Sequence, residues 1–541
     1  MPIRGQPWPQ RVQQAVWIDR WVRNGQFVQW TTRDHQHCET GLQGGGADSA
    51  ANHGIHAMVW QSPRSEITLS NCQELSIVPS DFRQQGYNRL ALPIAPVGRL
   101  TAPMELTLGR VLAALPARNL LRYVGALLAR GLEVAAKFGL YVLAARRMGG
   151  YQAGLFFLCL TWINLMSTAA RLGLERAASR HVAAELAIGD GAAARRTVLT
   201  SLTWTALASL VAGWLTWLLA SPASLLLFHQ PDLTDPLRIA ALILPPQSIA
   251  FAVGFILIGL GRGVAGQMVQ SAIPPLLSLL ALLAGLNQAA TVLMAYTISY
   301  ATCCCAGLCL VAYEWRRAFA DRPGAHTEDA EALPPLWTTA RPFLVIELVQ
   351  SALLSLPVLV LGVFASAVAV SAFSIANRVT MMINTILVSL ALIAAPGFAR
   401  HHRLGEYADL RRVDRQTRLL AAIVCIPIVA VIMIFPHALL ALLGGSFADA
   451  SAALIVLSVG QIVNILLPTE DMMLAMTGHG AVLRRVNLQQ LAVCCILCLT
   501  LIPWLGLMGA AIVTSISLIQ GRVGFFRAVQ QAIPALRGWS R

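Results

Sequence analysis

The sequence predicts an all-α polytopic membrane protein with twelve transmembrane helices in two parallel repeats of six. Three observations lead to this prediction. The mean hydropathy is +0.62, only 12% of the residues are charged, and apolar stretches recur that are long enough to cross a bilayer, which takes about 20 residues in a helix. Ordinary globular domains carry about twice that charged fraction, so the composition excludes a soluble enzyme.

The apolar stretches begin near residue 119 and continue almost to the end of the chain. None alternates polar and apolar residues as a lipid-facing β-strand does. The twelve predicted helices lie near 119–145, 150–170, 197–220, 237–260, 265–286, 289–313, 341–365, 367–396, 418–443, 450–476, 486–505 and 509–530.

Arginines occupy every second gap between these stretches. The gaps after odd-numbered stretches carry only Arg146, Arg147 and Arg238. This asymmetry is the positive-inside pattern, and it predicts both chain ends in the cytoplasm of a bacterial inner membrane. The net charge of +14 is therefore an insertion signal that can also hold anionic membrane lipids, and no nucleic acid is expected. The gaps after even-numbered stretches carry Arg171, Arg176, Arg180, Arg195, Arg196, Arg262, Arg316, Arg317, Arg322, Arg341, Arg400, Arg403, Arg411, Arg412, Arg415, Arg418, Arg484 and Arg485.

Two loop motifs recur at nearly one offset. Glycine, an acid, alanine and an Arg-Arg pair occur in residues 189–196 and again in 405–412, 216 residues later (405 − 189). A glycine pair around one basic residue occurs in 261–263 and in 478–480, 217 residues later (478 − 261). Six helices per half make the halves parallel, as in transporters whose site lies between two repeats near the membrane midplane.

These motifs divide the chain into predicted segments. Residues 1–103 are polar and aperiodic and begin with no signal peptide. They are interpreted either as a disordered tail or as an extension ahead of a translation start at Met104. The other predicted segments are two six-helix halves at 104–313 and 341–530, a cytoplasmic linker between them at 314–340, and a cytoplasmic tail at 531–541.

Several of these loops resemble those of the polysaccharide and O-antigen flippases, a family of the multidrug/oligosaccharidyl-lipid/polysaccharide (MOP) exporter superfamily. The resemblance covers residues 105–530 and is carried by the segments 171–177, 189–196, Ala376-Asn377-Arg378, 396–412, Gly444-Gly445-Ser446-Phe447 with Ala450, and 503–511. It implies a MATE-like fold that moves a polyprenyl-pyrophosphate-linked oligosaccharide from the cytoplasmic to the outer leaflet for surface polysaccharide biosynthesis. It also implies glycosyltransferases and a polysaccharide polymerase as partners. Twelve helices differ from the fourteen of peptidoglycan-precursor flippases.

Basic residues inside the predicted helices are candidates for holding such a pyrophosphate. Arg130, Glu133 and Lys137 share one face of the first helix, and Arg378 follows Asn377 in the eighth. An ionisable group at this depth costs about 3 kcal/mol by insertion scales and usually faces a cavity. Guanidinium groups bind phosphate through paired hydrogen bonds, so Arg130, Lys137, Asn377 and Arg378 are the predicted substrate-binding residues. The alternative is that Arg130 or Lys137 only pairs with Glu133 along the helix.

Acids in the predicted helices are candidates for binding a coupling ion, H+ or Na+. The predicted ion-coupling residues are Glu133, Glu347 in the seventh helix and Asp471 late in the tenth. The alternative is that Glu347 and Asp471 lie near the membrane surface and are solvated, an interpretation that applies most strongly to Glu470. Helical spacing places one polar stripe on the tenth helix, made of Gln461, Asn464, Pro468 and Asp471.

The chain contains no nucleotide-binding loop, no assembled catalytic set and no cysteines at metal-ligand spacing with histidine. We therefore expect no enzyme activity, no cofactor and no metal. Two other functions stay open, a multidrug or cation antiporter of the same fold and a non-transporting scaffold for glycan enzymes. A cationic cavity favours the flippase, whereas a cationic-drug exporter needs acids there.

Overall fold

A computed structural model describes residues 117–320, 333–443, 447 and 450–536. The chain divides into two compact units, Met1–Pro103 and Met104–Arg541, and all described residues belong to the second. The predictions for residues 1–103, for the middle of the linker and for Gly444-Gly445-Ser446 lie outside the described residues.

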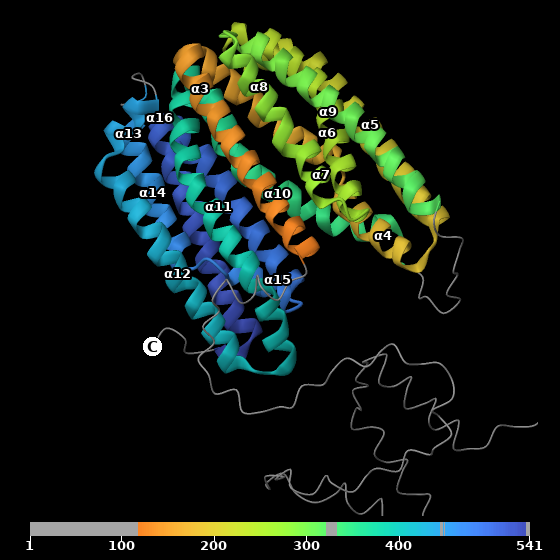
Figure 1. Ribbon diagram of the computed structural model, residues 1–541. Coiled ribbons are helices and arrows are strands. Elements are labelled where there is room, and N and C mark those ends of the chain that lie inside the picture. The colour runs from red at the N-terminus through yellow and green to blue at the C-terminus, as the bar shows by residue number, and fades with distance from the viewer. Residues whose placement is uncertain (1–116, 321–332, 444–446, 448–449, 537–541) are drawn as a thin grey trace, which may run out of the picture. The chain divides into compact units, whose positions relative to one another are not determined.

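The described elements are helices throughout (Figure 1). Short π-helical turns at Ala223–Leu227 and Met268–Ala272 and 3-10 turns at Pro231–Leu233 and Pro534–Leu536 accompany them. The α-helices are α3 (Ala117–Ala170), α4 (Leu174–Ile188), α5 (Gly191–Pro222), α6 (Thr234–Gly259), α7 (Gly263–Gln267), α8 (Ile273–Leu283), α9 (Ala289–Ala320), α10 (Leu336–Phe364), α11 (Ala367–Leu404), α12 (Tyr407–Ile434), α13 (Pro436–Leu443), α14 (Ser451–Leu466), α15 (Glu470–Met476) and α16 (Gly480–Ala532).

The predicted all-α membrane class is confirmed. Nine helices among the described residues are long and apolar enough to cross a membrane, or ten when the bent pair α14 and α15 counts as one span. α3 and α16 each join two helices across a glycine with positive φ, Gly149 at 73° and Gly506 at 54°. Counting each of these two as a pair of spans gives twelve, which is compatible with the predicted number.

The two halves repeat in their loops as well as in their order of helices. The glycines that begin the matching motifs, Gly189 and Gly405, both end a helix in the left-handed region, with φ of 85° and 72°. Gly261 and Gly478 share the same conformation, at 78° and 84°. A residue with a side chain adopts this conformation at a cost, so the sequence repeat corresponds to a repeated backbone turn.

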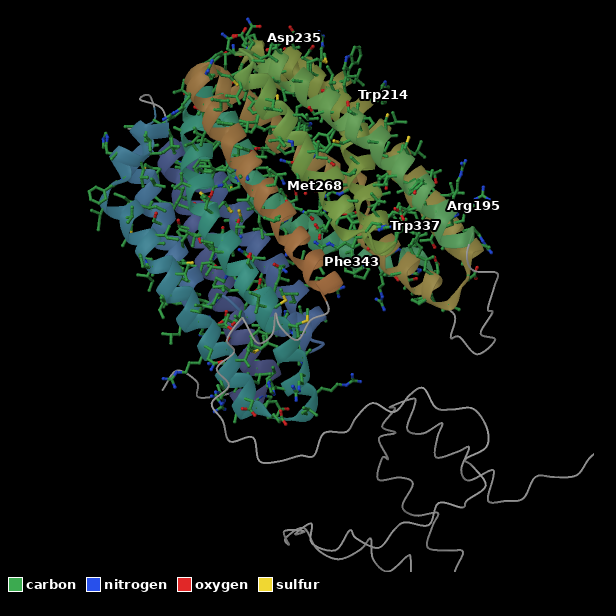
Figure 2. All side chains as sticks on the ribbon, in the orientation of Figure 1. Arg195, Trp214, Asp235, Met268, Trp337 and Phe343 are labelled. Atoms are coloured by element: carbon green, nitrogen blue, oxygen red, sulfur yellow. The ribbon has the colours of Figure 1, made fainter. Side chains whose placement is uncertain are left out.

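Alternate loops lie at the same end of the helices. Arg195 at the start of α5 and Asp235 at the start of α6 lie at opposite ends (Figure 2). We call the end with Arg195 the arginine-rich end. Both ends of the predicted linker are helical, since α9 reaches Ala320 and α10 begins at Leu336. Glu314, at the first of these ends, pairs with Arg262 at 2.9 Å.

The halves meet where α3 packs along α10 and α11 (Figure 1). Their backbones approach closely at Gly154 of α3, where an added Cβ atom would lie 1.8 Å from the carbonyl oxygen of Ala367. Gly362 of α10 similarly accommodates Leu158, with 2.1 Å between an added Cβ and the leucine side chain. Small residues allow such close approach between membrane helices, and these glycines position the walls of the cavity described below.

Substituting Gly154 with alanine should push α3 away from α11 and destabilise the protein by about 1–3 kcal/mol, the usual cost of overpacking. The thermal unfolding midpoint of the purified protein in one detergent measures this change. Gly131 on the same helix is the matched control, because an added Cβ there meets nothing within 4 Å. Gly131→Ala should be neutral or stabilising by up to about 1 kcal/mol. Equal midpoints for the two variants would contradict the assignment of a close contact.

Candidate functional site

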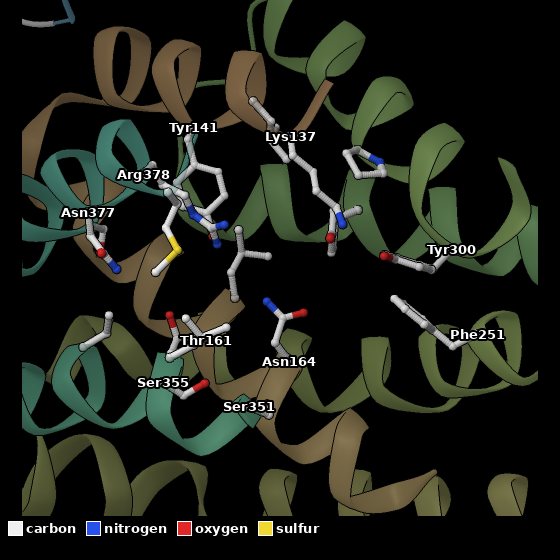
Figure 3. A pocket seen from close by; sticks show the side chains of 18 residues that line it. Lys137, Tyr141, Thr161, Asn164, Phe251, Tyr300, Ser351, Ser355, Asn377 and Arg378 are labelled. Atoms are coloured by element: carbon white, nitrogen blue, oxygen red, sulfur yellow. The ribbon is translucent and has the colours of Figure 1, made fainter. Parts of the chain in front are cut away.

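A cavity of about 260 Å³ lies between the two halves (Figure 3). Its wall combines residues of α3, α6, α8 and α9 from the first half with residues of α10 and α11 from the second. Among the described residues that line it are two cations and no acid. The polar part of the lining includes Lys137, Tyr141, Thr161, Asn164, Ser351, Ser355, Asn377 and Arg378.

Arg378 is held in this wall by Tyr141 of the other half. Its Nη2 donates to the Tyr141 hydroxyl at 2.5 Å, and its guanidinium carbon lies 4.1 Å from the centre of the same ring. Tyr141 in turn stacks on Phe157 at 4.7 Å between ring centres. The side-chain oxygen of neighbouring Asn377 is buried and has no hydrogen-bond partner among the described residues. Arg378 is therefore fixed by an aromatic ring and keeps donors available to an anion.

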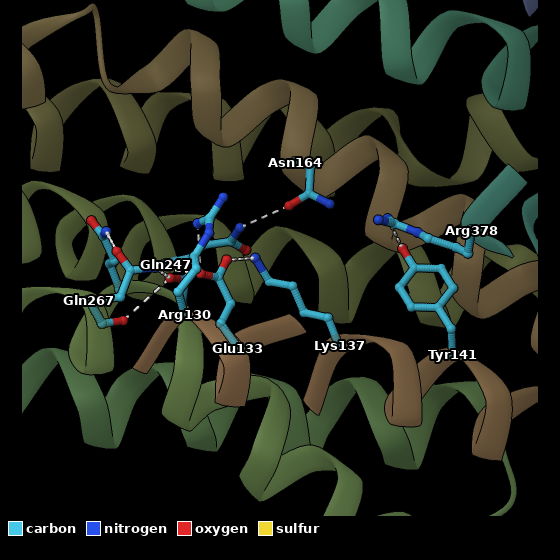
Figure 4. Close-up of polar contacts among 10 residues, drawn as sticks. Arg130, Glu133, Lys137, Tyr141, Asn164, Gln247, Gln267 and Arg378 are labelled. Carbon is cyan, nitrogen blue, oxygen red and sulfur yellow. Dashed lines mark hydrogen bonds and ion pairs between the residues drawn. The ribbon is translucent and has the colours of Figure 1, made fainter. Parts of the chain in front are cut away.

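Glu133 forms a second group at the edge of the cavity (Figure 4). Its carboxylate accepts from Arg130 at 2.8 Å, from Lys137 at 2.6 Å, and from the amide of Gln267 on α7. The shared face predicted for Arg130, Glu133 and Lys137 is confirmed. The Glu133 side chain is 8% exposed, whereas that of Lys137 is 38% exposed and also lines the cavity. Arg130 is not among the lining residues.

A line of polar side chains leads along α3 from the cavity toward the arginine-rich end. Gln247 donates to Asn164 at 3.2 Å, and the hydroxyls of Ser167 and Ser248 are 3.0 Å apart. One turn further, Arg171 pairs with Glu175 at 3.1 Å, and both are buried. Neither this line of polar residues nor the role of Tyr141 was predicted from the sequence. The signal was the spacing 164, 167, 171 on one helix face, and the spacing 133, 137, 141 on another.

The other two predicted ion-coupling acids are not among the residues that line the cavity. Glu347 of α10 pairs with Arg176 of α4, which joins the two halves near the arginine-rich end. Asp471 pairs with Arg522 at 3.1 Å, and its side chain is 40% exposed. Of the three predicted ion-coupling acids, only Glu133 pairs with a cation that lines the cavity, Lys137.

The contact between α4 and α10 contains a second polar link. An imidazole nitrogen of His181 lies 3.1 Å from the Thr339 hydroxyl. Burial, and secondarily the charge of Arg180, lowers the pKa of His181 below its usual range near 6.5. The imidazole is therefore neutral at pH 7, and this link adds no charge to the contact between the halves.

The stripe predicted on the tenth helix is wrong beyond Asn464. Proline lacks the N–H that a continuous helix needs, so the chain breaks around Pro468 and α15 is bent by 42° from α14. Gln461 and Asn464 do share a face, joined at 2.9 Å. Asp471 lies beyond the break, so helical spacing does not place it on that face.

The interpretation of Glu470 as a solvated acid is also wrong, because Glu470 is fully buried. Arg418 of α12 donates to Glu470 at 2.6 Å and to the equally buried Asp414 at 2.6 Å. Thr469 donates its hydroxyl to Asp414 and its backbone N–H to Glu470. Two carboxylates thus share one guanidinium, which connects α12 to the break between α14 and α15.

One group of side chains among the described residues has the geometry to hold a metal ion, namely His401, Glu406 and Asp409. Both acids are exposed, and His401 already pairs with Glu406 at 2.8 Å. The group lies at the arginine-rich end, between α11 and α12. Because its acids are exposed and its histidine already has a partner, we assign it no metal.

A family model described as polysaccharide biosynthesis protein matches residues 124–402, which is more than half of the chain. The chain belongs to this family. A second model, MatE, matches residues 342–500 in the second half of this family member. No curated protein matches the chain.

Solved structures of MOP-superfamily proteins share the fold of this polysaccharide biosynthesis protein. A multidrug resistance MATE transporter in its inward-facing conformation is 18% identical with a TM-score of 0.57, over 76% of this chain and 96% of that one. The lipid II flippase MurJ, inward closed, is 12% identical with a TM-score of 0.59, over 75% and 87%. A variant of the Vibrio cholerae MATE transporter VcmN is 14% identical with a TM-score of 0.51, over 77% and 99%. The resemblance drawn from the sequence, and its MATE-like fold, are confirmed.

Substituting Arg418 with alanine should leave Asp414 and Glu470 buried without their shared cation. Removing one partner of a buried ion pair costs about 3–5 kcal/mol, so the thermal unfolding midpoint in detergent should fall well below that of the wild type. Arg415 on the same helix is exposed, and Arg415→Ala should change stability by less than about 0.5 kcal/mol. If both variants unfold at the wild-type midpoint, the buried network does not hold the broken helix.

Proposed function

We propose that this chain flips a polyprenyl-pyrophosphate-linked oligosaccharide from the cytoplasmic to the outer leaflet of a bacterial inner membrane, for surface polysaccharide biosynthesis. The two halves rock about their interface and expose the cavity to each side in turn. The observation that carries this proposal is the charge of the cavity, which is lined by Lys137 and Arg378 and by no acid among the described residues.

The pyrophosphate is the part of such a substrate that needs protein help to cross the membrane, because a charge in the hydrocarbon is costly. Arg378 and Lys137 approach the cavity from opposite halves and neutralise that charge together. Asn377 and Asn164 offer amides to the oxygens of the pyrophosphate or of the first sugar. The volume of about 260 Å³ is below the roughly 300–1,000 Å³ of pockets that enclose a drug-sized ligand. The cavity in this conformation therefore fits the pyrophosphate region and not a whole oligosaccharide.

The ion-coupling residues remain part of the proposal. In this proposal Glu133 binds and releases H+ or Na+ beside Lys137, the predicted substrate-binding cation. Glu347 lies at the contact between α4 and α10, where binding an ion would weaken its pairing with Arg176 and loosen the two halves. Asp471 would act near the arginine-rich end. Glycosyltransferases that build the oligosaccharide and a polymerase that extends it are the expected neighbours in the pathway.

A multidrug or cation antiporter is the second candidate, favoured by the MatE match and by the MATE fold of the solved neighbours. A cationic drug requires acids at mid-depth to balance its charge. Glu133, which lies beside the lining residue Lys137, is already paired with two cations and an amide. The cavity charge therefore favours an anionic substrate.

Arg378→Ala should lower surface glycan at least about tenfold in a host that carries only the variant gene, because charge-assisted hydrogen bonds contribute about 1.5–3 kcal/mol each. Arg130→Ala should give a smaller loss, since Arg130 acts on the pairing of Glu133. Glycan is measured on the cell surface at equal amounts of membrane protein. Arg484→Ala changes an exposed arginine of the arginine-rich end and should leave the glycan at wild-type level. A normal amount of surface glycan with Arg378→Ala would contradict the proposed role of Arg378 in binding the pyrophosphate. The non-transporting scaffold function would then explain the result better.

A further inference from the structure

We propose that Lys137 is shared between Glu133 and the phosphate of the substrate, so that Glu133 takes up a proton when an anionic substrate enters the cavity. This inference rests on the proposed function, because it requires a substrate with phosphate charge. It assigns Glu133 the task of compensating charge within the substrate site.

The shared position of Lys137 is visible in the contacts of its ammonium group (Figure 4). Its Nζ is 2.6 Å from one oxygen of Glu133, while its side chain lines the cavity that also contains Arg378. An ammonium group is a single mobile charge on a flexible stem. A phosphate bound between Lys137 and Arg378 therefore draws on the cation that Glu133 needs.

The groups around Glu133 determine how it responds. On its own helix it faces Arg130 and Lys137. From the packed elements it faces the amide of Gln267, the hydroxyl of Ser271 and the buried phenol of Tyr300, which are neutral at pH 7. Arg130 is largely exposed, at 55%, and contributes less than a buried cation. Lys137 is thus the principal balancing charge on the cavity side.

The sign of the coupling follows from these charges. A pyrophosphate adds negative charge beside Glu133 and engages Lys137, and both changes favour the protonated carboxyl. The proton from solution becomes bound to a Glu133 oxygen, and no other covalent bond changes. Because linkage is reciprocal, protonation of Glu133 must tighten binding of the anion by the same factor. A transporter in which proton and cationic substrate compete would show the opposite sign.

The test uses the full chain in lipid nanodiscs and farnesyl pyrophosphate as a probe of the lipid pyrophosphate. Calorimetry measures its Kd from about pH 6 to about pH 8, and a pH indicator in weak buffer measures proton uptake. For the wild type, affinity should rise toward low pH by up to about tenfold per pH unit, the limit for one linked proton. Glu133→Gln should bind at least as tightly at high pH, with a smaller pH slope and about one proton fewer taken up. Comparing the two chains removes the probe's own ionisation.

Two further variants complete the test. Glu314→Gln removes a glutamate that pairs with Arg262 and does not line the cavity, so it should keep the wild-type slope and proton uptake. Lys137→Gln should bind the probe more weakly and lose most of the proton uptake. Binding with equal slopes and equal uptake in wild type and Glu133→Gln would overturn the coupling alone. If the wild type does not bind the probe at any pH, the proposed function fails and the coupling fails with it.

Discussion

The structure depends on one constraint, which is that a charge inside the membrane must have a partner. Insertion scales put an isolated ionised side chain at about 3 kcal/mol, and three groups of charged side chains among the described residues meet this cost in different ways. Glu133 has two cations and an amide around it, Arg378 has an aromatic ring and its hydroxyl, and Asp414 and Glu470 share Arg418. The positions of α3, α11 and α12 follow from these pairings as much as from apolar packing, because moving any of these helices would leave a charge without a partner.

The two halves repeat in topology but not in the use of charge. Matching glycines end matching helices with the same backbone conformation. The first half nevertheless keeps one buried acid, Glu133, beside the cavity, whereas the buried acids Asp414 and Glu470 of the second half lie at the break between α14 and α15. The repeated turns preserve the scaffold, and the unrepeated acids give each half its own task. In the proposed mechanism the first half senses the charge of the substrate, and the second half contributes Arg378 and a rigid support.

The fold and part of the site were predictable from sequence for reasons that are local. Helix length and hydropathy depend on one segment at a time, and residues 130, 133 and 137 meet because of helical spacing alone. The partner of Arg378 was not predictable, because Tyr141 lies 237 residues away in the chain and only the packing of α3 on α11 brings them together. Glu470 was predicted to be solvated because of its place near the membrane surface, but it follows the break around Pro468 and is buried against Arg418. Helical spacing therefore predicts which residues are neighbours along one unbroken helix, but not across a break or between helices.

The contact between Gly154 and the Ala367 carbonyl has a mechanical consequence. No side chain from Gly154 interlocks with α11 there, so in the proposed rocking mechanism the two halves turn about this point without a rotamer change at Gly154. From Gly154 to the end of α3 at Ala170 is about 24 Å of helix at 1.5 Å per residue. A small rotation of one half about the contact between Gly154 and Ala367 would move the arginine-rich end, where α4 meets α10, by a larger distance. In this mechanism the absence of a side chain at Gly154 allows the rotation of the two halves, and a bulkier residue there would block the rotation sterically.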